Sequence, residues 1–185
     1  MADFGDFFEY LTLDELELRS GTANMERIVE SIGPITRKNL RTLYYSTTGF
    51  LAHRIDFALL AFPSLSDLTL WSIQFQVTSE FFATLAPLPL RSITFLGPTD
   101  RPFIDEIRTF LESTDRPSTL SDLGVDVEIP SRSPSPLPRG EKAMLFDHLT
   151  TGQDATARLE GTCAKCNITL RGSIMEALRV MRERR

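Results

Sequence analysis

The feature that most constrains the fold is a short apolar pattern that occurs five times between residues 11 and 125. Each copy has apolar residues at its first, fourth and sixth positions. The copies are Leu13-Leu16-Leu18, Leu40-Leu43-Tyr45, Leu65-Leu68-Leu70, Leu90-Ile93-Phe95 and Leu120-Leu123-Val125. The central residues of successive copies lie 25 to 30 residues apart. A single copy means little in a leucine-rich chain, but five copies at near-constant spacing indicate a repeated structural unit.

Between the copies, the period of the apolar residues changes from two to about 3.6, as an amphipathic helix requires. Such runs cover residues 25–32, 51–62, 81–85 and 104–111, and Gly33-Pro34 is expected to end the first of them. Strands that alternate with helices predict a parallel sheet with right-handed connections. An ordinary doubly wound sheet is the alternative, but its strands are usually longer apolar runs. We therefore expect stacked units with strands on a concave face and helices on a convex face.

Two of the segments, Leu65-Ser-Asp-Leu68-Thr-Leu70 and Leu13-Asp-Glu-Leu16-Glu-Leu18, resemble leucine-rich repeats. With Phe62-Pro63-Ser64 before it, the first is similar to the repeat arm of fungal F-box proteins. The resemblance implies an α/β fold, a right-handed βα solenoid of about five repeats with a C-terminal helical cap. It also implies recognition of a protein partner, as in the substrate-recognition arm of an F-box ubiquitin-ligase receptor. The segment before the first strand is too short for the F-box itself, so we expect that domain to be absent.

The candidate binding residues follow from the alternation of side chains along each strand. The apolar positions are expected to face the core, and the residues between them to face the concave side. The candidates for partner binding are Tyr44, Asp67, Thr69, Trp71, Thr94 and Leu96. Trp71 and Leu96 occupy equivalent positions of neighbouring copies, so we expect an exposed apolar cluster of the kind that forms binding hot spots. The alternative is that Trp71 only packs over the end of a strand.

The chain is expected to have three parts: a solenoid over residues 1–129, a Pro/Ser-rich linker or insertion over 130–140, and a C-terminal cap over 141–185. The cap has room for a degenerate sixth repeat, with Ala157-Arg158-Leu159 as its candidate strand. Near the end, Gly172-Ser173 followed by Glu176 predicts a capping box. That box would open a helix whose inward residues are Ile174, Leu178 and Met181.

Several function classes are disfavoured by the sequence. A net charge of −5 argues against a nucleic-acid partner, and no apolar run is long enough to span a membrane. With two His residues and no glycine-rich phosphate loop, we expect no enzyme activity, cofactor or small-molecule substrate. Cys163 and Cys166 have the spacing of half a zinc site, which makes them weak metal candidates. The alternatives are therefore a small zinc- or redox-linked protein, or a truncated repeat protein without independent function; the expected location is intracellular, cytoplasmic or nuclear.

Overall fold

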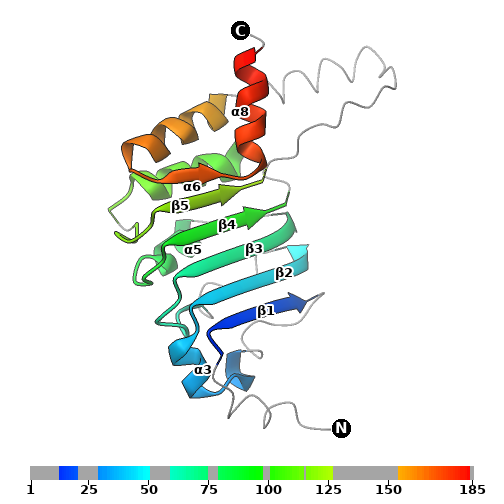
Figure 1. Ribbon diagram of the computed structural model, residues 1–185, viewed down its shortest axis with the longest axis vertical. Coiled ribbons are helices and arrows are strands. Elements are labelled where there is room, and N and C mark those ends of the chain that lie inside the picture. Colours follow the sequence, from blue (N-terminus) through cyan, green and yellow to red (C-terminus); the bar gives the residue numbers. More distant parts are fainter. Residues whose placement is uncertain are drawn as a thin grey trace.

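The computed structural model describes residues 13–20, 29–50, 59–74, 79–97, 101–114, 116–126 and 154–183. Its main feature is one six-stranded sheet in which all strands are parallel and follow one another in chain order (Figure 1). The strands are β1 (Glu15–Ser20), β2 (Thr42–Phe50), β3 (Asp67–Gln74), β4 (Ser92–Leu96), β5 (Asp122–Val125) and β6 (Thr169–Arg171). The fold is therefore α/β with a parallel sheet, as the sequence predicted.

The apolar pattern also predicted how the strands align. The central residues of the five copies are direct partners in the sheet, in the order Leu16, Leu43, Leu68, Ile93 and Leu123. The last apolar residues of the copies pair in the same way, from Leu18 through to Val125. Equivalent residues of neighbouring strands are therefore separated by one strand spacing, about 4.8 Å.

Helices lie between the strands along the chain, and one follows the last strand. Those between strands are α3 (Pro34–Asn39), α5 (Ser79–Leu85), α6 (Arg101–Glu112) and a further helix over residues 154–165, and α8 (Ser173–Glu183) follows β6. In Figure 1, α5 and α6 lie behind the sheet, and α8 stands beyond β6 at one end of it. A parallel sheet in strict chain order with connections of one hand places the connecting segments on one side.

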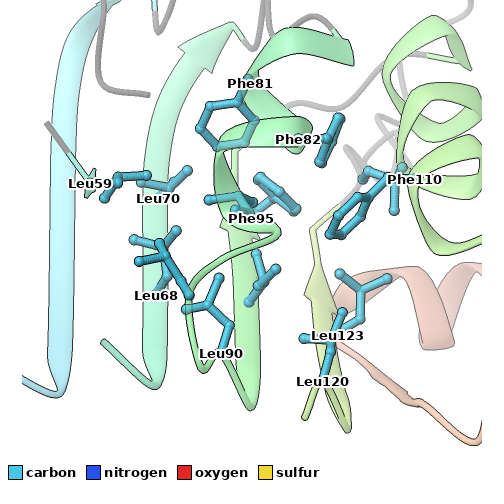
Figure 2. Close-up of a cluster of buried hydrophobic side chains, with 14 of the residues drawn as sticks. Leu59, Leu68, Leu70, Phe81, Phe82, Leu90, Phe95, Phe110, Leu120 and Leu123 are labelled. Carbon is cyan, nitrogen blue, oxygen red and sulfur yellow. The ribbon is translucent and has the colours of Figure 1, made fainter. Parts of the chain in front are cut away.

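The core lies between the sheet and these helices (Figure 2). Phe95 of β4 is at its centre and makes edge contacts with Phe82 of α5 and Phe103 of α6, at centroid distances of 6.3 and 5.0 Å. Phe82 in turn stacks on Phe110 at 4.8 Å, which joins the two helices. The apolar faces predicted for α5 and α6 are thus confirmed.

The prediction of a sixth strand near the C-terminal end was wrong in its position. Ala157–Leu159 is not a strand, because it lies inside the helix over residues 154–165. Ala155, Leu159 and Cys163 are buried at a spacing of four residues, which is the period of a helix. The sixth strand is β6 instead, and it keeps only Leu170 of the apolar pattern. Asn167 and Gly172 stand at the pattern's first and last positions, which is why the sequence did not reveal it.

The Gly33-Pro34 dipeptide also has a second role that the sequence reading missed. A helical run ends just before it, and α3 begins at Pro34 with Gly33 as its N-cap residue. Proline suits the first position of a helix, since its φ is already helical and the missing N–H has no partner there. The dipeptide therefore both ends one helix and starts the next.

The starts of the strands are linked by a repeated set of backbone hydrogen bonds, which we call the strand-start ladder. One carbonyl before each strand accepts N–H groups from the next repeat along, at 2.7–3.1 Å. The accepting carbonyls belong to Asp14, Arg41, Ser66, Arg91 and Ser121. The first four each accept two N–H groups, so both lone pairs of the oxygen are used.

Several expected segments lie outside the described residues. These are the linker at 130–140, residues 141–150 at the start of the cap, and most of the helices expected over 25–32 and 51–62. Leu59 and Phe62, at the end of the second of these, are fully buried. Among the described residues, no helix is long and apolar enough to cross a membrane.

Candidate functional site: the open face of the sheet

The side chains of the sheet divide into two sets with different surroundings. On β3 and β4, the pattern residues are buried against the helices, and the residues between them are half-buried. We call the side that carries the second set the open face. Its residues form three rows across the strands: a first row of Glu15, Thr42, Asp67, Ser92, Asp122 and Thr169, a middle row of Glu17, Tyr44, Thr69, Thr94, Gly124 and Arg171, and a last row of Arg19, Ser46, Trp71 and Leu96.

All six predicted binding residues lie on this face. Trp71 is paired with Leu96 on one side and with Ser46 on the other. Tyr44, Thr69 and Thr94 are successive members of the middle row. The structure therefore brings the candidates together on three neighbouring strands.

The expected exposure of Trp71 and Leu96 needs correction, because both side chains are half-buried. Neighbouring strands are so close that each side chain in a row covers the flank of the next. Only three large apolar side chains of the described residues are exposed: Ile35 (52%), Leu60 (44%) and Met175 (37%). The Trp71–Leu96 pair is thus a partly covered apolar strip, and only part of each side chain can contact a partner.

The middle row is shaped by a glycine. Gly124 of β5 lies beside Thr94 of β4, and a β-carbon at Gly124 would come within 2.7 Å of the Thr94 side chain. The threonine therefore occupies the space that a side chain on β5 would fill.

A hollow of ≈ 500 Å³ lies at the β1 end of the open face. It is lined by Glu15, Leu16, Glu17, Arg19, Thr42 and Tyr44. Arg19 donates to the Glu17 carboxylate at 2.6 Å, and this hydrogen bond is the main cause of a raised pKa of the guanidinium. The sequence reading included Tyr44 but missed this hollow, because only the alignment of β1 with β2 brings its lining together.

Carboxylates are spread over the open face, and their partners differ. Asp122 forms an ion pair with Arg171 of β6 at 2.5 Å. Asp126, just after β5, accepts the backbone N–H of Ser173 at 3.0 Å and so holds the start of α8. Asp67 accepts only the hydroxyl of its neighbour Ser66, at 2.6 Å, among the described residues. Asp67 is therefore a carboxylate in the middle of the sheet with no cation of the described residues paired to it.

The expected capping box of α8 has a different arrangement from the one predicted. The helix begins at Ser173, as expected, but the Glu176 carboxylate accepts from Arg179 at 2.7 Å. The first turn is instead tied to Asp126 of the preceding repeat. Ile174 and Leu178 are buried, as predicted, while the side chain of Met181 lies outside the described part.

The cysteines of the Cys163-x-x-Cys166 motif are at the end of the helix over residues 154–165. Cys163 is buried, and burial raises the pKa of its thiol to about 11, so the thiol is protonated at neutral pH. Cys166 lies within hydrogen-bonding distance of the Leu111 carbonyl, at 3.5 Å. In the described part of the chain, no three His, Cys, Asp or Glu residues lie together in a way that could hold a metal ion. A protonated buried thiol is poorly suited to metal binding or to disulfide exchange.

Fold and site together define an α/β protein whose parallel sheet has helices packed on one face and polar rows with a central apolar strip on the other. No protein family model, no curated protein and no solved structure matches the chain.

Proposed function

We propose that this chain is a protein-interaction module of the leucine-rich-repeat kind, a right-handed βα solenoid that binds a protein partner on the open face. Three observations support the repeat assignment: the strands follow in chain order, equivalent residues align, and the strand-start ladder recurs from β1 to β6. Six strands suggest six repeats rather than the five expected from sequence. α8 acts in this proposal as the C-terminal cap.

The binding role depends mainly on the open face. In a soluble parallel sheet both faces are usually covered, because helical connections pack on each side. Here α5 and α6 cover one face, and the described helices leave the rows around Trp71 uncovered. A half-buried Trp beside a Leu, surrounded by hydroxyl and carboxylate groups, is the composition of a binding hot spot. By analogy with F-box receptors, the partner would be a protein selected for further processing.

The test is capture of interacting proteins from the cells that produce this chain, compared across three variants. Trp71→Ala removes the apolar strip, and Thr69→Arg adds a long charged side chain to the same face without removing core packing. Ile35→Ala is the matched control, since Ile35 is an exposed apolar residue of α3 away from the open face. We expect the first two variants to lose a partner that the wild type and Ile35→Ala retain.

Thermal unfolding of each variant separates binding from folding. If Trp71→Ala lowers the midpoint strongly, Trp71 is a packing residue and Thr69→Arg becomes the deciding variant. Retention of the same partners by Thr69→Arg would refute binding on the open face.

A further inference from the structure

We infer that the partner segment carries a lysine or arginine four residues from a bulky apolar residue. The basic residue contacts Asp67, and the apolar residue contacts the Trp71–Leu96 strip. This inference deepens the proposed function and depends on it. It commits to one kind of partner, a cationic and apolar stretch of polypeptide, because the charge of the open face is complementary to it.

The charge of the open face is the first part of the case. The three rows and Asp126 carry five carboxylates, on Glu15, Glu17, Asp67, Asp122 and Asp126, against two guanidinium groups, on Arg19 and Arg171. Arg19 is bound to Glu17 and Arg171 to Asp122, so each cation is already neutralised. The charges of these described residues therefore sum to a negative value.

Asp67 is the carboxylate of the open face that we expect to bind the partner's cation. It stands at the centre of the first row between Thr42 and Ser92, and neither neighbour is charged. The nearest cations in sequence, Arg41 and Arg91, precede the strands and are exposed. Among the described residues, no ion pair joins either of them to Asp67. A partner cation would therefore gain a charge-assisted hydrogen bond that the free protein does not satisfy.

The apolar half of the site lies on the same strand. Trp71 is four residues beyond Asp67 on β3, which corresponds to about 13 Å at roughly 3.3 Å per residue. An extended partner places a basic residue and an apolar residue on the same side when they are four positions apart, because side chains alternate. Lys or Arg with Leu, Phe or Met at that spacing would match Asp67 and the Trp71–Leu96 strip together.

The local potential can be measured directly, because Trp71 is the only tryptophan of the chain. Its fluorescence would be quenched with caesium and with iodide at an ionic strength of about 0.01 M, where screening is weak. Relative to free N-acetyltryptophanamide, we expect caesium to be favoured over iodide by about twofold or more, since a negative surface concentrates cations. Asp67→Lys should reduce this preference by more than Glu80→Lys, which makes the same change of charge at an exposed site on α5.

The partner chemistry is tested by selecting short random peptides displayed on phage against the wild type, Asp67→Lys, Asp67→Asn and Trp71→Ala. Wild-type selection should enrich peptides with Lys or Arg four positions from a bulky apolar residue. Asp67→Lys should shift the basic position to Asp or Glu while the apolar position is kept. Asp67→Asn, which still accepts from Ser66, should lose the basic preference without an acidic one. Trp71→Ala should lose the apolar preference.

The outcomes separate the inference from the proposed function. Peptides that depend on Trp71 but show no basic preference, or the same preference with Asp67→Lys, would overturn the inference and leave the proposed function in place. Peptides whose binding is unaffected by Trp71→Ala, or no enrichment at all, would overturn both. Iodide quenching that equals or exceeds caesium quenching would overturn the inference independently of any partner.

Discussion

Gly97, just after β4, is the position where a single added carbon should have its largest effect on the fold. Its φ is +125°, outside the small left-handed region that other residues can adopt. A β-carbon there would lie 2.1 Å from the backbone carbonyl oxygen of Ser72 on β3. That oxygen cannot rotate away as a side chain could, so Gly97→Ala must push β3 and β4 apart by about 1 Å or change the backbone.

The cost of Gly97→Ala can be approximated from these two effects. An unfavourable φ at one residue costs about 1 to 3 kcal/mol. Separation of the strand ends weakens further packing, so we expect a loss of about 2 to 4 kcal/mol in the free energy of unfolding. For a chain of this size, that corresponds to roughly 5 to 15 °C in the thermal midpoint. Urea unfolding followed by Trp71 fluorescence measures the loss, since Trp71 lies one residue from Ser72.

Gly161 provides the matched control because it has the opposite surroundings. It lies inside the helix over residues 154–165, and a β-carbon there would meet no atom within 4 Å apart from its own stretch of helix. Gly161→Ala should therefore stabilise the protein by up to about 1 kcal/mol, as alanine does in a helix interior. Surface substitutions usually change the free energy of unfolding by less than about 0.5 kcal/mol. A smaller change than this for Gly97→Ala, or changes in the same direction for both variants, would refute the reasoning from backbone geometry.

Three further predictions concern the core, the cysteines and the α8 anchor. Leu70→Ala should lower the free energy of unfolding, measured in urea, by about 2 to 5 kcal/mol. Leu18→Ala, at the equivalent but half-buried position of β1, should lower it clearly less. Equal losses would show that β1 is as fully covered as β3. Cys163 should react with a thiol reagent only after unfolding at pH 8. Because its pKa is raised to about 11 from 9.0, stability should be highest below pH 9 and fall towards pH 11 as the unfolded thiol ionises first. Cys163→Ala should lack that part of the fall, and an unchanged slope would contradict the assignment. Asp126→Ala should destabilise the protein by about 1 kcal/mol, because the hydrogen bond to the Ser173 N–H is lost, and Asp126→Asn should have a smaller effect. The direct measurement is the protection of the α8 amides from hydrogen exchange. Undiminished protection in Asp126→Ala would argue against the anchor.

The sequence predicted the strands well where one physical requirement acts on every copy. Leu43, Leu68 and Ile93 must each fill the same layer of the core, so the same spacing recurs and even the alignment of strands can be read from it. The prediction failed where that requirement is relaxed. β6 is an edge strand next to α8, and a glycine at position 172 replaces the last apolar residue because its φ of +97° and its closeness to the Val125 carbonyl exclude a side chain.

On the open face, the sequence predicted the direction of the side chains correctly but not how much of each is covered. Alternation along the strands placed Tyr44, Trp71 and Leu96 on the correct side, since it depends only on backbone geometry. How much of Trp71 is covered depends on the neighbours across the sheet, which no single strand specifies. The hollow beside Tyr44 and the pairing of Asp122 with Arg171 likewise depend on which residues stand opposite each other, and β6 had been placed elsewhere.

The strand-start ladder has a consequence for how such a chain can change over time. Its donors and acceptors are peptide groups, which every residue except proline supplies in full. The side chains at Asp14, Arg41, Ser66, Arg91 and Ser121 already differ in size and charge, yet the bonds recur. Substitutions at these turns can therefore accumulate while the linkage between strands persists, so the architecture can be retained while the sequence at the turns changes.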